Sequence, residues 1–191
     1  SQGSCLFKQI WKSPRVEHPQ RIKADLGMGA LAWIIAFPLV TFVGQLIDWG
    51  LYLFSSFEGY EQVAVRYLKT TVESPPLLAM ALFTIIIAAP CIEEFLFRGC
   101  LQSFLRNYMS VKGSILFSSL CFALFHFSLS QGLGNISLCA SLFVLALFLG
   151  FIYERQASLF ASVGLHMTFN IVSTTRVLFF SEYEYSSEIQ S

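Results

Sequence analysis

Hydrophobic residues occur in this chain as long runs that short polar stretches separate. Five of these runs approach the roughly 20 residues that a helix needs to cross a bilayer. They lie at about 27–54, 75–107, 112–130, 136–153 and 157–180. Pro38 lies inside the first run and predicts a kink there. We therefore predict an all-α fold, a polytopic membrane helix bundle of about five transmembrane helices.

The composition supports a membrane protein. Hydrophobic residues make up 55% of the chain and charged residues only 13%, whereas about a quarter of a typical soluble domain is charged. The formal net charge is zero, which gives no attraction to nucleic acid. We therefore expect the lipid bilayer as a partner and no nucleic acid.

The runs divide the chain into four segments. We expect a basic leader at 1–26 in the cytoplasm or at the membrane surface, followed by a first transmembrane helix and loop at 27–74. A helix bundle at 75–180 holds the candidate chemistry, and 181–191 is a short polar tail. The first run is about twice the length of a signal-peptide core, which indicates a retained membrane helix.

Basic residues are enriched in alternate loops. Those that define the pattern are Lys8, Lys12, Arg15, Arg21, Lys23, Arg106, Lys112 and Arg155. Lysine and arginine accumulate on the cytoplasmic side of membrane proteins, so the N-terminus is predicted to be cytoplasmic and the C-terminus external. Arg176, near the end of the fifth run, does not fit this arrangement.

Ionisable and amide side chains interrupt the last four runs at three places. They are Glu93, Glu94 and Arg98 in the second run, His126 in the third, and His166 with Asn170 in the fifth. Burying a charge in a membrane costs at least a few kcal/mol, so such groups commonly mark functional sites.

The spacing of these residues predicts which of them share a helix face. Glu94 and Arg98 are four residues apart and can form an ion pair, which offsets part of the cost of burying both. Glu93 lies about 100° further around the same helix, so its side chain points elsewhere. His166 and Asn170 are also four residues apart and project from one face.

A depth argument brings the second and third runs together. If they form a hairpin that turns near 109–110, Glu93 lies about 17 residues before the turn and His126 about 16 after it. At about 1.5 Å per residue the two side chains reach nearly the same depth. They are therefore predicted to meet in a buried polar cavity. His166 reaches that depth only if the second helix projects beyond the bilayer.

These groups together suffice to hydrolyse an amide with water. Burial favours the protonated form of a carboxyl group, so a partly buried Glu93 is suited to take a proton from water near neutral pH. A neutral His126 can hold and orient that water, and His166 with Asn170 can donate hydrogen bonds to an oxyanion.

Two further sets of side chains bear on this chemistry. Glu94 and Arg98 would support the Glu93 rotamer. Three serines stay open as alternative nucleophiles: Ser103, Ser128 and Ser173.

Three short motifs carry a family resemblance. EEFLFR at 93–98 matches EExxxR, FALFH at 122–126 matches FxxxH, and HMTFN at 166–170 matches HxxxN. In this order and on successive hydrophobic segments, they resemble the CPBP family over about 75–180. That family contains the type II CAAX prenyl proteases and the bacterial Abi proteins.

The resemblance implies an intramembrane endopeptidase whose general base is Glu93, aided by His126. It implies that His166 and Asn170 form the oxyanion site and that Glu94 and Arg98 hold the architecture. It also implies a glutamate-dependent mechanism without a metal cofactor, a peptide or lipid-modified protein substrate, and a location in a bacterial cell membrane. Phe122, within the second motif, is expected to pack near the site.

Other interpretations stay open. The chain could be a non-catalytic immunity or scaffold protein with the same fold, or a carrier coupled to protons or metal ions. Zinc bound by Glu93, His126 and His166 is a chemically reasonable alternative to the metal-free site. The Glu94–Arg98 pair could be purely structural, and Asn170 could be an interhelical hydrogen bond.

Overall fold

The structure is a computed structural model that describes residues 22–55 and 63–188, and every element in those ranges is a helix. The all-α prediction is therefore confirmed. Of the predicted leader at 1–26, residues 1–21 lie outside the described residues, as do residues 189–191 of the predicted tail.

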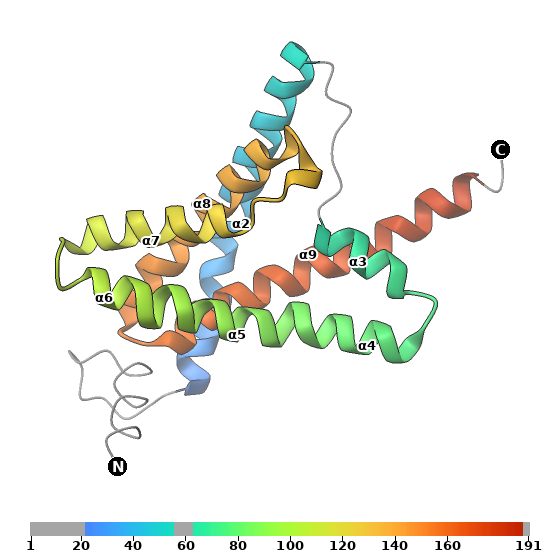
Figure 1. Cartoon of the computed structure of the whole chain (residues 1–191). Helices are drawn as coiled ribbons and strands as arrows, with labels where there is room; N and C mark the ends of the chain where they lie inside the picture. Colours follow the sequence, from blue (N-terminus) through green and yellow to red (C-terminus); the bar gives the residue numbers. More distant parts are fainter. Residues whose placement is uncertain (1–21, 56–62, 189–191) are drawn as a thin grey trace.

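Within residues 63–188 the helices follow one another through short connections (Figure 1). The helix bounds are α2 Ile22–Ser55, α3 Val63–Thr71, α4 Pro75–Phe83, η1 Thr84–Ala88, α5 Ala89–Glu94, η2 Phe95–Gln102, α6 Ser103–Leu105, α7 Val111–Phe125, η3 Leu129–Gln131, α8 Gly134–Gln156 and α9 Leu159–Glu188. The segments from α4 to α6 form one helical rod, in which η1 and η2 have π-helical hydrogen bonding. Helix α9 continues past residue 180, where the last run was predicted to end.

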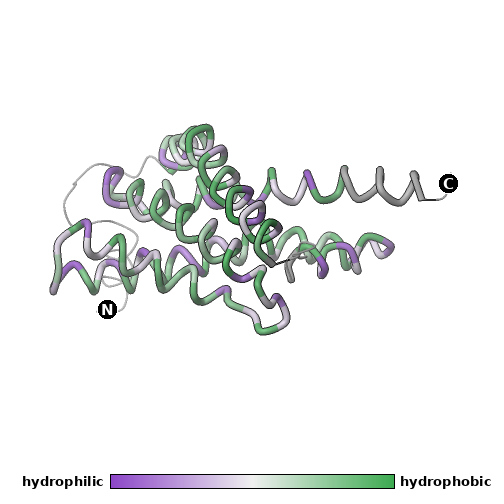
Figure 2. Tube along the Cα trace, turned by 90° about the horizontal axis from the view of Figure 1, so that it is seen from above, coloured by the Kyte–Doolittle hydropathy of each residue, from purple (hydrophilic) through white to green (hydrophobic). Residues whose placement is uncertain are grey.

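Within the described residues, three helices are long and apolar enough to cross a membrane: Ile22–Phe54, Pro75–Leu105 and Gly134–Gln156. Hydrophobic residues cover long stretches of these helices (Figure 2). Helix α7 has 15 residues and reaches only about 22 Å, short of a hydrocarbon core of about 30 Å. Helix α9 is longer, but His166, Asn170 and Arg176 interrupt its apolar sequence. Three of the five predicted spans thus meet both criteria.

The third run does not stay helical to residue 130 as predicted. Helix α7 ends at Phe125, and His126 has φ −89° and ψ 0°, outside the α-helical region. The backbone N–H groups of His126 and Phe127 bond three residues back, which tightens the last turn. The side chain of Asn135 then binds both the N–H and the C=O of Ser128, so the chain leaves the helix axis despite its apolar sequence.

Helix α2 packs against α8 and α9. Glycines make the closest approach possible: a Cβ on Gly29 would lie 2.7 Å from the backbone nitrogen of Leu165. A Cβ on Gly164 would lie 2.9 Å from Cα of Leu26. Small residues at such crossings allow backbones to approach closely in membrane proteins. The contact fixes the start of α9, the helix that carries His166.

The end of α8 contains a strained residue that offers a stability test. Ala157 has φ 50° and ψ 36°, the left-handed conformation, which costs a non-glycine residue roughly 1–2 kcal/mol. We expect Ala157→Gly to stabilise the protein by about 1 kcal/mol, because glycine adopts this conformation without a steric penalty. Equilibrium unfolding in detergent measures the change. Ala157→Val should act in the opposite direction, and a stabilising valine would contradict the assignment.

Candidate active site

The charged residues of the helical rod lie where the helix type changes. Helix α5 ends at Glu94, and the π-helical segment η2 begins at Phe95. Segments of π-helix within α-helices are uncommon and are frequently found at functional sites. Glu93, Glu94 and Arg98 therefore lie at the junction between the two helix types.

Glu94 and Arg98 form the predicted ion pair. Arg98 Nη1 lies 3.0 Å from Glu94 Oε1, and both side chains are fully buried. Arg98 Nη2 also donates to the backbone carbonyl of Ala146 on α8, at 3.1 Å. The guanidinium carbon lies 4.5 Å from the centre of the Phe122 ring, at cation–π distance. Arg98 thus joins the rod to α7 and α8 with both charges out of contact with solvent.

Glu94 also holds the first of the two histidines. His166 Nδ1, on α9, lies 2.9 Å from Glu94 Oε1. An ionised carboxylate only accepts hydrogen bonds, so Nδ1 carries the proton in this contact. The ring is thereby fixed with Nε2 directed to Glu93, whose Oε2 lies 3.9 Å away. The sequence suggested that Glu94 supports the rotamer of Glu93. In the structure, Glu94 instead contacts His166 and orients its ring.

His126 is oriented in the same manner from the other side. Its Nδ1 lies 2.9 Å from the backbone carbonyl of Phe122, one turn earlier in α7. A carbonyl only accepts, so Nδ1 donates here as well. Nε2 lies 3.7 Å from Glu93 Oε2, which agrees with the equal depths predicted for the two residues.

Glu93 Oε2 is therefore the point at which the two imidazoles converge. Both Nε2 atoms are too distant for a direct hydrogen bond to it. The side chains of Glu93 and His126 are 18% and 29% exposed, so water can reach the group, whereas His166 is only 6% exposed. The arrangement places a partly accessible carboxylate between two imidazoles. The Nδ1 atom of each imidazole already donates a hydrogen bond to another group.

Phe122 has a larger part in the site than packing. Its ring is fully buried and lies edge-on to His166, with the centroids 5.8 Å apart. The same ring faces the Arg98 guanidinium, and its carbonyl accepts from His126. The sequence predicted that Phe122 packs near the site. It could not predict the hydrogen bond to the Phe122 carbonyl, because every residue type has a backbone carbonyl.

Asn170 lies one helical turn after His166 on α9. Its Nδ2 donates at 2.8 Å to the carbonyl of Ile85, within the π-helical segment η1. This is the interhelical hydrogen bond that the sequence offered as an alternative. Nδ2 carries a second N–H, so the oxyanion role stays a prediction.

A second set of polar contacts, not predicted from the sequence, ties η2 to α8. Gln102 is fully buried, and its Nε2 donates at 3.2 Å both to the carbonyl of Gly150 and to Glu154 Oε1. Ser118, on α7, donates to Gln102 Oε1. Arg98 and Gln102, four residues apart, thus bind carbonyls that are four residues apart on α8, which sets the register of the two helices.

Asn135 fixes the loop that follows His126, and its loss should be measurable. Its Oδ1 accepts from Ser128 N at 2.9 Å, and its Nδ2 donates to the carbonyls of Ser128 and Gly132. We expect Asn135→Leu to lower the unfolding free energy in detergent by about 1–3 kcal/mol, because partly buried backbone groups of Ser128 and Gly132 lose their partners. Ser130→Ala, an exposed hydroxyl in the same loop, is the matched control and should change little. Equal effects of the two variants would contradict this role.

The donor atoms around Glu93 are spaced more widely than the ligands of a tetrahedral zinc ion. Donor atoms around tetrahedral zinc, with bonds of about 2.0–2.1 Å, lie about 3.4 Å apart. The separations of 3.7 and 3.9 Å around Glu93 are wider. In the described part of the chain, no three His, Cys, Asp or Glu side chains converge closely enough to hold a metal ion.

Comparison with known protein families identifies the family of this chain. Residues 75–172 match the family described as type II CAAX prenyl endopeptidase Rce1-like. No curated protein and no solved structure matched the chain. The matched range covers about half of the chain and includes Glu93, His126 and His166. With three motifs on packed helices and a family match over the same residues, this chain belongs to the type II CAAX prenyl endopeptidase Rce1-like family.

Proposed function

We propose that this protein is an intramembrane endopeptidase that hydrolyses a peptide bond with water activated by Glu93. The convergence of two imidazole Nε2 atoms on Glu93 Oε2 carries the proposal. Each of the two distances is short enough for a water molecule, about 2.8 Å from both atoms, to bridge Glu93 and that imidazole. The family match and the apolar helices support a protease in a membrane.

The proposed reaction needs no covalent intermediate. The Glu93 carboxylate accepts one proton from the water, and the His126 Nε2 lone pair accepts a hydrogen bond from the other. The water oxygen bonds to the peptide carbonyl carbon, and the C=O electron pair moves to oxygen. When the tetrahedral intermediate collapses, the C–N bond breaks and protonated Glu93 returns its proton to the leaving amine.

The negative charge that develops on the peptide carbonyl oxygen requires hydrogen-bond donors. A protonated His166, whose Nδ1–H is already held by Glu94, would present Nε2–H to it. The second N–H of Asn170 is the other proposed donor. Arg98 acts at a distance, because its ion pair holds the Glu94 oxygen that orients His166.

We further propose that the substrate is a peptide or lipid-modified protein that reaches the site from the bilayer. The orientation with a cytoplasmic N-terminus and the location in a bacterial cell membrane are part of the same proposal. They rest on the distribution of basic residues and on the family resemblance.

A cleavage assay tests the proposal. The purified protein in detergent is incubated with a peptide library in two forms, with and without a prenylated cysteine near the C-terminus, and products are identified by mass spectrometry. We expect cleavage that His126→Ala and His166→Ala each reduce by about 10²–10⁴-fold. Cleavage only of the prenylated form would assign the substrate class.

A chelator arm separates the metal-free mechanism from a zinc site. Cleavage that persists after chelation supports the water–glutamate mechanism. Loss on chelation with recovery on added Zn²⁺ would replace it by zinc bound through Glu93, His126 and His166. A folded wild-type protein that cleaves no peptide in either form would favour the non-catalytic role.

A further inference from the structure

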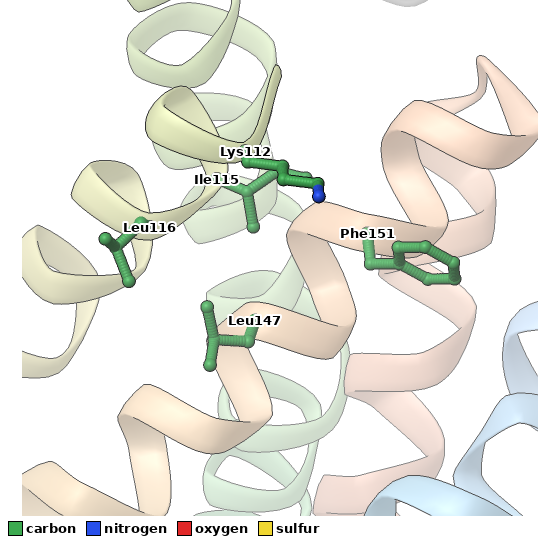
Figure 3. A pocket seen from close by; sticks show the side chains of 5 residues that line it. All are labelled: Lys112, Ile115, Leu116, Leu147 and Phe151. Atoms are coloured by element: carbon green, nitrogen blue, oxygen red, sulfur yellow. The ribbon is translucent and has the colours of Figure 1, made fainter. Parts of the chain in front are cut away.

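An open apolar groove lies between α7 and α8 (Figure 3), and none of the residues that line it belongs to the candidate active site. Ile115 and Leu116 on α7 and Leu147 and Phe151 on α8 form its walls, and Lys112 lies among them on α7. Its volume is about 370 Å³, within the range of small-molecule sites. A groove of this shape accommodates a flexible apolar chain.

Two cations mark one end of this groove. The helices run antiparallel, because Gly150 lies near Ile115 while Cys139 bonds the carbonyl of Ala123. The first turn of α7, with Lys112, therefore lies beside the last turn of α8, where Arg155 follows Phe151 by four residues. Both side chains are exposed, and neither has an ion-pair partner in residues 22–55 and 63–188.

The adjoining acidic group does not neutralise them. Glu154 precedes Arg155, but its Oε1 is engaged by Arg106 at 3.5 Å and by Gln102. The groove thus combines an apolar channel with two uncompensated positive charges at one end. That combination matches an amphiphile with an anionic head and a hydrocarbon tail. Basic pockets between membrane helices are known to bind anionic lipid head groups.

We propose that the α7–α8 groove is a binding site for one anionic glycerophospholipid. The phosphate lies between Lys112 and Arg155, and an acyl chain runs along Ile115, Leu116 and Leu147. This site depends neither on cleavage activity nor on the assignment of Glu93. It also agrees with the predicted cytoplasmic position of both cations, since the cytoplasmic leaflet carries anionic lipids.

Native mass spectrometry of the full chain in detergent tests the site. The protein is mixed with phosphatidylglycerol and phosphatidylcholine of identical acyl chains, and the ratio of the two bound lipids is measured. We expect wild type to retain phosphatidylglycerol preferentially. Lys112→Gln and Arg155→Gln should each lower that preference about fivefold, and the double variant about 25-fold. Lys23→Gln, an exposed cation on α2, is the matched control and should leave the ratio unchanged.

A second variant tests the apolar half of the site. Leu147→Trp fills the groove but keeps both cations, so it should reduce binding of both lipids. Glycerophosphoglycerol, the head group without acyl chains, should fail to displace the bound lipid. An unchanged lipid ratio in the Lys112→Gln/Arg155→Gln protein would overturn the proposal, as would displacement by the head group alone. Each variant's unfolding in detergent is recorded, so a loss caused by misfolding is recognised.

Discussion

Replacing Glu93 by glutamine is expected to reduce peptide cleavage by about 10²–10⁴-fold while leaving the protein folded. The amide has nearly the shape of the carboxylate and keeps an oxygen facing His126 and His166, but it cannot accept the proton of the attacking water. Within the described residues, Glu93 forms no direct ion pair with a lysine or an arginine, and the buried ion pair uses Glu94. Initial rates on the peptide found in the library assay measure the effect.

Glu73→Gln is the matched control for this experiment. Glu73 is an exposed glutamate in the turn before α4, remote from the motifs in sequence, and its replacement should leave the rate unchanged. Unfolding curves of both variants should overlay that of the wild type. Full activity of folded Glu93→Gln would remove the general base from the mechanism and return the serine nucleophiles or a bound metal to consideration.

The sequence was sufficient for the parts of the site that follow from helix geometry. Four-residue spacing predicted the Glu94–Arg98 pair, and the constant rise per residue brought Glu93 and His126 to one depth. These two predictions depend only on the order of the helices and on helical spacing. The approach of His166 to Glu93 was expected only if the second helix projected beyond the bilayer, and its contact with Glu94 was not predicted.

The remaining features depend on tertiary contacts that have no local pattern. The end of α7 at Phe125 is fixed by the side chain of Asn135, which belongs to the next helix. His126 is oriented by a backbone carbonyl, which every residue type supplies. The π-helical segments and the contacts of Gln102 could not be predicted for the same reason. Neither the apolar run nor the EExxxR motif specifies which carbonyl on α8 the side chain of Gln102 will bind.

The buried Glu94–Arg98 pair provides a second large effect, on stability. Arg98→Met leaves the Glu94 carboxylate fully buried without its counter-charge, and we expect it to lower the unfolding free energy by about 3–5 kcal/mol. Glu94→Gln strands the guanidinium in the same manner and should cost a similar amount. The double variant Glu94→Gln/Arg98→Met buries no charge and keeps an amide oxygen to accept from His166 Nδ1. It should therefore recover most of the loss.

The physical basis of this expectation is the difference between breaking and removing a buried ion pair. Two ions cost several kcal/mol each to desolvate, and their mutual attraction largely offsets that cost, so the intact pair contributes little net stability. One remaining ion keeps its cost and loses the compensation. Equilibrium unfolding of all four proteins in detergent, analysed as a double-mutant cycle, measures the coupling. If the two single losses simply added in the double variant, Arg98 and Glu94 would act independently, and Arg98 would owe its effect to Phe122 and the Ala146 carbonyl instead.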